Sequence, residues 1–363
     1  MLPIHLFSSS YPEARRRFLA GCAVAGIDVK YYLHPLAGPT GETISTDCCW
    51  IGPQDAERVL VLLSGTHGVE GFAGAGPQLD WLVRESARLP AGMAALVIHG
   101  INAWGFAWLR RTTEEGVDLN RNFVDFALPL PTNPGYDAIA NALVPAHADE
   151  QGLQDAETFL ESYRLQHGDA AYLTARGSGQ YNHPGGLFYG GVAPTYARQL
   201  TERIAADYGL AGRKVAVIDY HTGLGPHGHG ELIAGHDPDS TAAQRSRDWY
   251  GSSLTEPLKG TSITVPLLGM SQYGWKRLVG DGLTFVSLEF GTLPPRGMQR
   301  ALAQDHWLHN SRRCDWPTQE TQRIKKVMYD AYCPPEVAWR EMVLFRCRQV
   351  VRQATEGLQA QGG

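Results

Sequence analysis

Four short apolar runs are the feature of the sequence that most restricts its fold. Each ends in glycine or in polar residues, and the runs occupy residues 59–63, 95–99, 215–220 and 283–289. Continuous apolar runs of this length, rich in β-branched residues, are typical of strands that are buried on both faces, as in parallel sheets.

Helical patterns separate several of these runs. In residues 77–89, Leu79, Leu82 and Val83 are spaced along one face of a helix, and residues 193–208 repeat apolar positions at about the helical period. Strands that alternate with helices predict an α/β fold with a mixed, mostly parallel sheet that helices flank on both faces. Ligands of such sheets bind beyond the carboxyl ends of the strands.

Two segments depart from this alternation within the single domain that we expect residues 1–363 to form. Residues 127–186 contain several prolines, an acidic helical stretch and the turn-rich G-S-G-Q-Y-N-H-P-G-G. This segment is predicted to be a helical insertion that lies beside the sheet and walls a pocket. Residues 316–363 are helical in pattern, with two prolines between the expected helices.

The composition excludes some classes of partner. A net charge of −5 provides no basic surface for nucleic acid. No segment has 18 uninterrupted apolar residues, and the N-terminus lacks a signal-peptide pattern, so we expect no membrane association. Six cysteines without a C-x-x-C pair indicate reduced thiols, which favours the cytoplasm. The oligomeric state stays open.

Polar residues at the ends of two runs suit a metal ion. The stretch G-T-H-G-V-E-G follows the first run and holds His67 and Glu70, while His221 ends V-A-V-I-D-Y-H. Two imidazoles and one carboxylate are a typical zinc set that leaves a fourth position for water. The alternatives are a solvated His–Glu pair and a histidine that bonds to the neighbouring backbone.

Glu289 ends the last apolar run, L-T-F-V-S-L-E. A carboxylate is costly at the end of a buried strand unless it has a partner or a function. A general base beside a metal centre is one such function, and a structural salt bridge is the alternative.

A third polar stretch, W-L-R-R-T-T-E-E-G-V-D-L-N-R-N-F, places arginines among apolar residues. A planar guanidinium can hold a carboxylate through two hydrogen bonds, although a solvated charged loop is the more usual explanation. An aspartate here can orient a zinc-bound histidine by accepting its ring N–H. The candidates are Arg110, Arg111, Asp118, Asn120 and Arg121.

Taken in this order, the H-x-x-E pair, D-L-N-R-N-F, the single histidine and the late glutamate resemble the zinc carboxypeptidase superfamily. The resemblance includes its aspartoacylase and succinylglutamate desuccinylase relatives, is closest to an uncharacterised, largely bacterial branch, and covers roughly residues 55–295. It implies zinc bound by His67, Glu70 and His221, with Glu289 as base and proton shuttle.

The resemblance also implies how a substrate is held. Asn120 and Arg121 would bind its free carboxylate, and Arg111 or Arg110 would stabilise the oxyanion. The family's substrate-capping tyrosine has no secure counterpart, and Tyr273, 16 positions before Glu289, is a candidate.

These expectations define a zinc-dependent hydrolase that cleaves an amide bond in a small carboxylate-bearing substrate, in the manner of a metallocarboxypeptidase. The substrate would be a short peptide or an N-acyl amino acid, the latter if the protein is a deacylase of aspartoacylase type. A non-catalytic carboxylate-binding protein is the further alternative. Manganese, iron or cobalt would suit the same ligands. The G-L-G-P-H-G stretch fits a dinucleotide motif, but its internal proline argues against that function.

Overall fold

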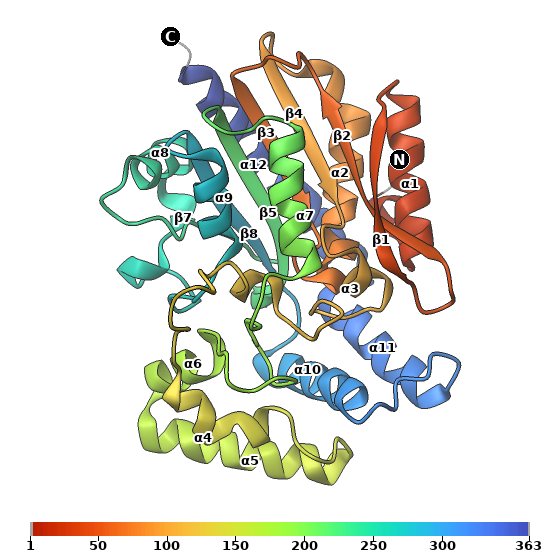
Figure 1. Cartoon of the computed structure of the whole chain (residues 1–363), viewed down its shortest axis with the longest axis vertical. Helices are drawn as coiled ribbons and strands as arrows, with labels where there is room; N and C mark the ends of the chain where they lie inside the picture. Colours follow the sequence, from red (N-terminus) through yellow and green to blue (C-terminus); the bar gives the residue numbers. More distant parts are fainter. Residues whose placement is uncertain (1–2, 362–363) are drawn as a thin grey trace.

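Eight strands form one mixed sheet in the computed structural model, which describes residues 3–361 (Figure 1). Their order across the sheet is β1-β2-β4-β3-β5-β8-β6-β7. The strands are β1 (Val29–Ala37), β2 (Thr43–Ile51), β3 (Arg58–Ser64), β4 (Met93–His99), β5 (Lys214–His227), β6 (Gly230–Ile233), β7 (Leu254–Thr255) and β8 (Leu283–Gly291).

The centre of the sheet is parallel, and its outer parts are mixed. Strands β4, β3, β5 and β8 pair in parallel, whereas β2 and β6 join this centre in antiparallel orientation. The four apolar runs of the sequence lie in these four central strands, so the predicted α/β fold with a mostly parallel sheet is confirmed.

Twelve α-helices surround the sheet within the described residues. Several begin at a side-chain cap; for example, Thr195 accepts a hydrogen bond from the backbone N–H of Arg198. The helices are α1 (Tyr11–Val24), α2 (Gly71–Arg84), α3 (Ala103–Ala107), α4 (Pro134–Leu143), α5 (Glu150–His167), α6 (Asp169–Gly177), α7 (Tyr196–Asp207), α8 (Thr241–Tyr250), α9 (Ser271–Val279), α10 (Pro295–Asn310), α11 (Gln319–Tyr332) and α12 (Val337–Ala360).

Side chains of the central strands alternate between two hydrophobic cores, one on each face of the sheet. In β3, Leu60 and Leu62 join the core that α1, α2 and α12 complete, whereas Val59 and Val61 join the core that α7 and α9 complete. Figure 1 shows α7 on one face of the sheet and α2 and α12 on the other. Because both faces of β3 are buried, its residues 59–63 are all apolar.

The first predicted helix differs from the observed one in its bounds and in one face residue. Helix α2 begins at Gly71, six positions before the predicted start at Pro77, and ends at Arg84. Small residues allow this early start: a Cβ on Gly74 would lie 2.8 Å from Cβ of Ser64. Val83 is 47% exposed and does not share the buried face of Leu79 and Leu82, so that part of the prediction was wrong.

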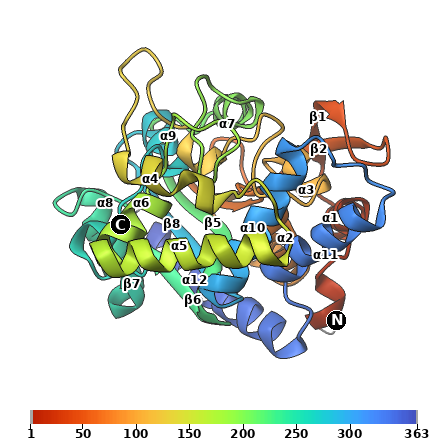
Figure 2. The same cartoon turned by 90° about the horizontal axis from the view of Figure 1, so that it is seen from below.

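Residues 127–186 include α4, α5 and α6, which lie below the sheet beside α10 (Figure 2). Ion pairs join the two parts, because Arg300 of α10 contacts Glu150 at 2.8 Å and also contacts Glu157, both in α5. Gln299 also donates a hydrogen bond to the carbonyl oxygen of Leu143. The segment is therefore anchored to α10, which follows β8.

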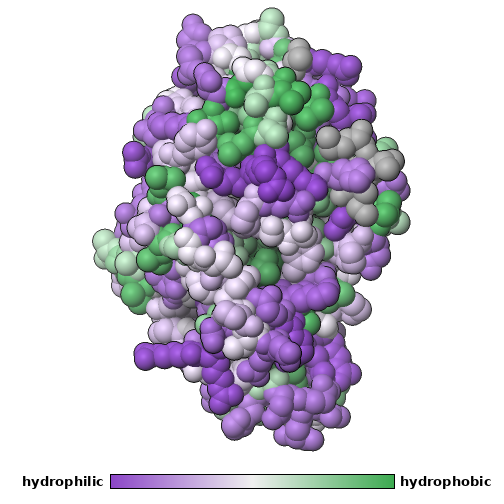
Figure 3. All heavy atoms as spheres, turned by 90° about the vertical axis from the view of Figure 1, so that its right-hand side faces the viewer, coloured by the Kyte–Doolittle hydropathy of each residue, from purple (hydrophilic) through white to green (hydrophobic). Residues whose placement is uncertain are grey.

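The face beside α1 and β1 is largely hydrophilic or intermediate in hydropathy, with a broad hydrophobic area in its upper part and smaller ones elsewhere (Figure 3). Among residues 3–361, no helix combines the length and the apolar character needed to cross a bilayer. The G-L-G-P-H-G stretch runs from β5 into the turn before β6, so a strand rather than a phosphate-binding helix follows it.

Candidate metal centre and active site

The candidate site lies beyond the carboxyl end of β3, beside the last residues of β8 and the middle of β5. His67 and Glu70 follow β3 directly, and Glu70 immediately precedes α2. His221 of β5 is in register with Glu289 of β8, so these two residues are neighbours across parallel strands. The sheet thus brings together residues that are far apart in the chain.

Three side chains converge on one point. His67 Nδ1 lies 2.9 Å from Glu70 Oε1, and His221 Nδ1 lies 3.1 Å from Glu70 Oε2. The two Nδ1 atoms are 3.2 Å apart. All three residues are buried, and their potential ligand atoms lie within 4.8 Å of one another. This group could hold a metal ion.

Two glycines of G-T-H-G-V-E-G make this geometry accessible. Gly65 has φ = 75°, a left-handed conformation that other residues rarely adopt. At Gly68, a Cβ would lie 2.1 Å from the carbonyl carbon of Gly105, so the turn and α3 touch backbone to backbone. Larger side chains at these two positions would displace His67 and Glu70.

A buried carboxylate stands behind each histidine. His67 Nε2 lies 3.0 Å from Asp118 Oδ1 and 2.8 Å from Arg111 Nη2. His221 Nε2 lies 2.9 Å from Asp219 Oδ2, in ion-pair contact without hydrogen-bond alignment. Both Nδ1 atoms therefore face the common point, and the carboxylates orient the rings.

Electrostatics distinguish the two glutamates. Burial alone would raise the pKa of Glu70, but the adjacent His67, His221 and Arg111 together lower it. Burial raises the pKa of Glu289 to about 8, and the nearby charge of Glu70 adds to this shift. Glu70 therefore favours its ionised form, which metal binding requires, whereas Glu289 holds a proton more readily than an ordinary carboxyl group does.

A cavity of about 170 Å³ opens onto this group. Apolar residues of several elements form much of its wall, including Leu173 of α6 and Leu302 of α10. The predicted site residues that line it are His67, Arg111, Asn120, Arg121, His221, Tyr273 and Glu289.

The structure separates the two adjacent arginines. Arg111 lines the cavity, and its guanidinium contacts Glu70 Oε1 at 2.9 Å and Asp118 Oδ2 at 3.2 Å. Arg110 turns the other way and pairs with buried Asp305 at 3.0 Å. The expectation that Arg110 contacts substrate is not supported, because its charge is neutralised outside the cavity.

Asn120 and Arg121 hold their positions through backbone contacts. The side-chain oxygen of Asn120 accepts a hydrogen bond from Ser271 N, and Arg121 donates to the carbonyl oxygens of Asn120 and Gly177. Arg121 Nε is buried and has no partner among the described residues. Tyr273 is 37% exposed at the rim of the cavity.

Three polar residues of the site were missed by the sequence analysis. Asp219 is two positions before His221 in a strand, and residues with this spacing share a face, so the D-Y-H pattern contained the signal. Arg176 of α6 and Tyr332 of α11 also line the cavity. No local pattern marks these two, because tertiary packing alone brings their helices to the site.

Comparison with known proteins places the chain in a family. A family model described as a protein of unknown function (DUF2817) matches residues 7–346. The chain belongs to this family. A comparison with curated proteins found no match.

Several solved structures are similar at low sequence identity. Carboxypeptidase A from Helicoverpa armigera is 13% identical (TM-score 0.48), with 90% of this chain and 74% of that chain covered. Thrombin-activatable fibrinolysis inhibitor is 12% identical (TM-score 0.49), with 96% and 74% covered. An aspartoacylase family protein from Mesorhizobium loti is 13% identical (TM-score 0.36), with 78% and 66% covered.

Proposed function

We propose that this protein is a zinc-dependent hydrolase that cleaves an amide bond in a small substrate with a free carboxylate. The observation that carries the proposal is the buried convergence of His67, Glu70 and His221. A carboxylate at the far nitrogen of each histidine adds support, because this arrangement is usual for metal-binding imidazoles.

The donor set fits zinc, which takes imidazole nitrogen and carboxylate oxygen and accepts a site with three protein ligands. When bound, zinc supplies the Lewis acidity that activates water and polarises a carbonyl group. Each other step belongs to a side chain of this protein.

Glu289 moves the proton. Its Oε1 accepts a hydrogen bond from the backbone N–H of Leu224, which fixes the carboxylate at the cavity wall. In its ionised form the carboxylate can take a proton from water, and because its pKa is raised to about 8, it can hold that proton until it passes to the leaving nitrogen. The net reaction adds one water molecule across the amide bond and releases an acid and an amine.

Two arginines interact with the negative charges of the substrate. Arg111 lies beside the ligand Glu70 and faces the cavity, where it can stabilise the oxyanion that develops during attack. The buried Nε of Arg121 has no partner within residues 3–361, and together with Asn120 this side chain can hold the carboxylate that identifies the substrate.

The size of the cavity favours a deacylase as the second candidate. A volume of about 170 Å³, walled on one side by α6, suits an N-acyl amino acid or the end of a short peptide better than a long chain. A non-catalytic carboxylate-binding protein would need Arg121 and Asn120 but neither Glu289 nor the three converging ligands.

The test combines metal analysis with a substrate screen. Purified protein should contain about one zinc ion per chain and hydrolyse some short peptides or N-acyl amino acids until a chelator removes the metal. Glu289→Gln should lower kcat by roughly a thousandfold because the base is lost, while zinc content stays unchanged. The matched control is Glu341→Gln, at an exposed position of α12.

Two results would reject the proposal. Loss of zinc from Glu289→Gln would show that Glu289 is a ligand and not the base. A zinc-loaded wild-type protein that cleaves none of the compounds but binds their carboxylates would favour the non-catalytic alternative.

A further inference from the structure

A third guanidinium stands at the cavity wall, on the segment 127–186. Arg176 lies near the end of α6, and its Nε donates a hydrogen bond to Gln299 Oε1 at 3.0 Å. Its Cζ lies 5.9 Å from the ring centroid of Phe188. The Cζ atoms of Arg121 and Arg111 lie 5.6 and 5.4 Å from the same centroid. One aromatic ring is thus surrounded by three cations.

These cations differ in how their charge is balanced. Arg111 contacts two carboxylates, those of Glu70 and Asp118. Arg121 and Arg176 form no ion pair with any residue of the described chain, 3–361. Over the same residues, Glu289 is the only carboxylate that lines the cavity. The cavity therefore holds two guanidinium groups that have no ion-pair partner among residues 3–361.

Leaving such charges without a counterion is unfavourable. Burial lowers the pKa of both Arg121 and Arg176, which reflects the cost of removing a cation from water. The amide of Gln299 and the face of Phe188 offset this cost only in part, because neither carries a negative charge. An anionic ligand would complete the balance.

We infer that Arg176 binds a second anionic group of the substrate, in addition to the carboxylate held by Arg121 and Asn120. The preferred substrate would then be an amide with two acidic groups. The second group lies either on the side chain of the amino acid or on the acyl part. This inference rests on the proposed function for the bond that is cleaved, but the recognition of two anions can be measured without catalysis.

Binding is the first measurement. We expect wild-type protein to bind at least one of succinate, glutarate and adipate about 10- to 100-fold more tightly than the monocarboxylate butyrate in calorimetric titrations. Arg176→Gln should abolish this difference and leave butyrate binding unchanged. Arg176→Lys should retain part of it, because the charge stays but the planar fork is lost.

The matched control is Arg164→Gln, at a surface position of the neighbouring helix α5. It should leave both affinities unchanged. Equal binding of the mono- and dicarboxylates by the wild type would overturn the inference. So would an equal loss of both affinities in Arg176→Gln with an unchanged melting temperature.

Isosteric substrate pairs then distinguish the two sources of the second anion. N-acetylglutamate against N-acetylglutamine tests the amino-acid side chain, and N-succinylleucine against N-succinamoylleucine tests the acyl group. We expect kcat/KM to favour the acidic member of one pair by about 10- to 100-fold, and Arg176→Gln to remove that preference.

The two proposals can fail separately. Dicarboxylate binding without any hydrolysis would reject the proposed function and keep the inference. Hydrolysis with no preference within either pair would keep the proposed function and reject the inference.

Discussion

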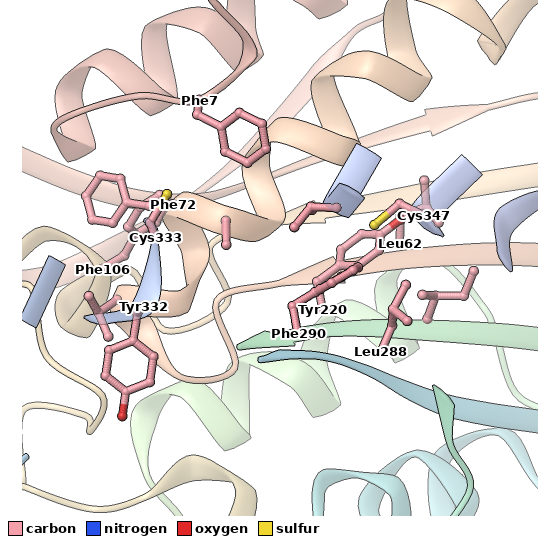
Figure 4. Close-up of a cluster of buried hydrophobic side chains, with 14 of the residues drawn as sticks. Phe7, Leu62, Phe72, Phe106, Tyr220, Leu288, Phe290, Tyr332, Cys333 and Cys347 are labelled. Carbon is pink, nitrogen blue, oxygen red and sulfur yellow. The ribbon is translucent and has the colours of Figure 1, made fainter. Parts of the chain in front are cut away.

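Tyr332 is the residue whose position at the site is least apparent from its neighbours in the chain. It ends α11, and its ring packs against Gly223 of β5. The contact is close, since a Cβ on Gly223 would lie 3.0 Å from Tyr332 Cε1. Figure 4 shows its hydroxyl pointing away from the surrounding apolar side chains. Burial raises the pKa of this phenol, so it remains a hydrogen-bond donor in the cavity that Arg111 and Glu289 also line.

We predict that Tyr332→Phe lowers kcat by about a hundredfold, as expected when one donor to a developing negative charge is removed. Steady-state kinetics on the substrate found in the screen would measure the effect. Zinc content and melting temperature should match those of the wild type. An unchanged kcat would show that the hydroxyl has only a packing role.

The burial of His99 predicts that the folded protein loses stability in acid. It is 1% exposed and stacks on Phe18 with 4.5 Å between ring centroids. Burial lowers its pKa to about 3, against about 6.5 for an unfolded chain. The unfolded state therefore binds the proton more readily, so stability is complete above about pH 6.5 and falls as the pH decreases toward 3.

When the pH is lowered from 7.5 to 4.5, His99 alone should decrease the free energy of unfolding by about 3 kcal/mol. Urea unfolding of wild type and His99→Gln over this pH range would isolate this contribution. The variant should be less stable at pH 7.5 but lose less stability on acidification. Parallel pH dependences of the two proteins would contradict the assignment.

At the scale of elements, a buried charge cluster joins α10, α11 and the segment before the site. Asp305 of α10 accepts a 2.6 Å contact from Lys325 of α11 and a 3.0 Å contact from Arg110. Asp305 and Lys325 are each 1% exposed. One carboxylate thus neutralises two cations, and it also holds Arg110 away from the cavity while Arg111 faces it.

Removing the shared anion should therefore cost more than removing one cation. We predict that Asp305→Asn destabilises the protein by about 3–5 kcal/mol, because two buried cations lose their partner. Lys325→Met should cost only about 1–2 kcal/mol, since Asp305 keeps Arg110. Denaturant unfolding of both variants gives the comparison, and the reverse order would disprove this account of the cluster.

Strand elements were predictable from the sequence because burial on both faces leaves a continuous apolar run. The bounds of the helices were less predictable. The start of α2 depends on small residues that fit against β3, a contact that periodicity does not report. Val83 fits the helical pattern of Leu79 and Leu82 but is 47% exposed, because it lies in the last turn of α2, where burial ends after Leu82.

At the scale of the whole molecule, metal binding should couple to stability. The three candidate ligands come from two distant parts of the chain, so the unfolded state has no such site and the proposed zinc ion would bind the folded state preferentially. With free zinc at about a thousand times its dissociation constant, the folded state should gain about 4 kcal/mol.

Thermal or urea unfolding with zinc and with a chelator would measure this gain. His221→Gln should abolish most of it, whereas Glu289→Gln should retain it. A zinc effect of equal size in His221→Gln would mean that the ion binds elsewhere.

The sequence by itself determined the α/β sheet and the residues His67, Glu70, His221 and Glu289, because strand burial and strand ends leave local patterns in the chain. Tertiary structure alone decided that Arg111 faces the cavity while Arg110 does not, and that Arg176 and Tyr332 reach it. The physical reason is that contacts between distant parts of the chain position these side chains. Packing of α6 and α11 brings Arg176 and Tyr332 to the cavity. Asp305, 195 positions from Arg110, holds that arginine outside the cavity, while Glu70 and Asp118 hold Arg111 at its wall.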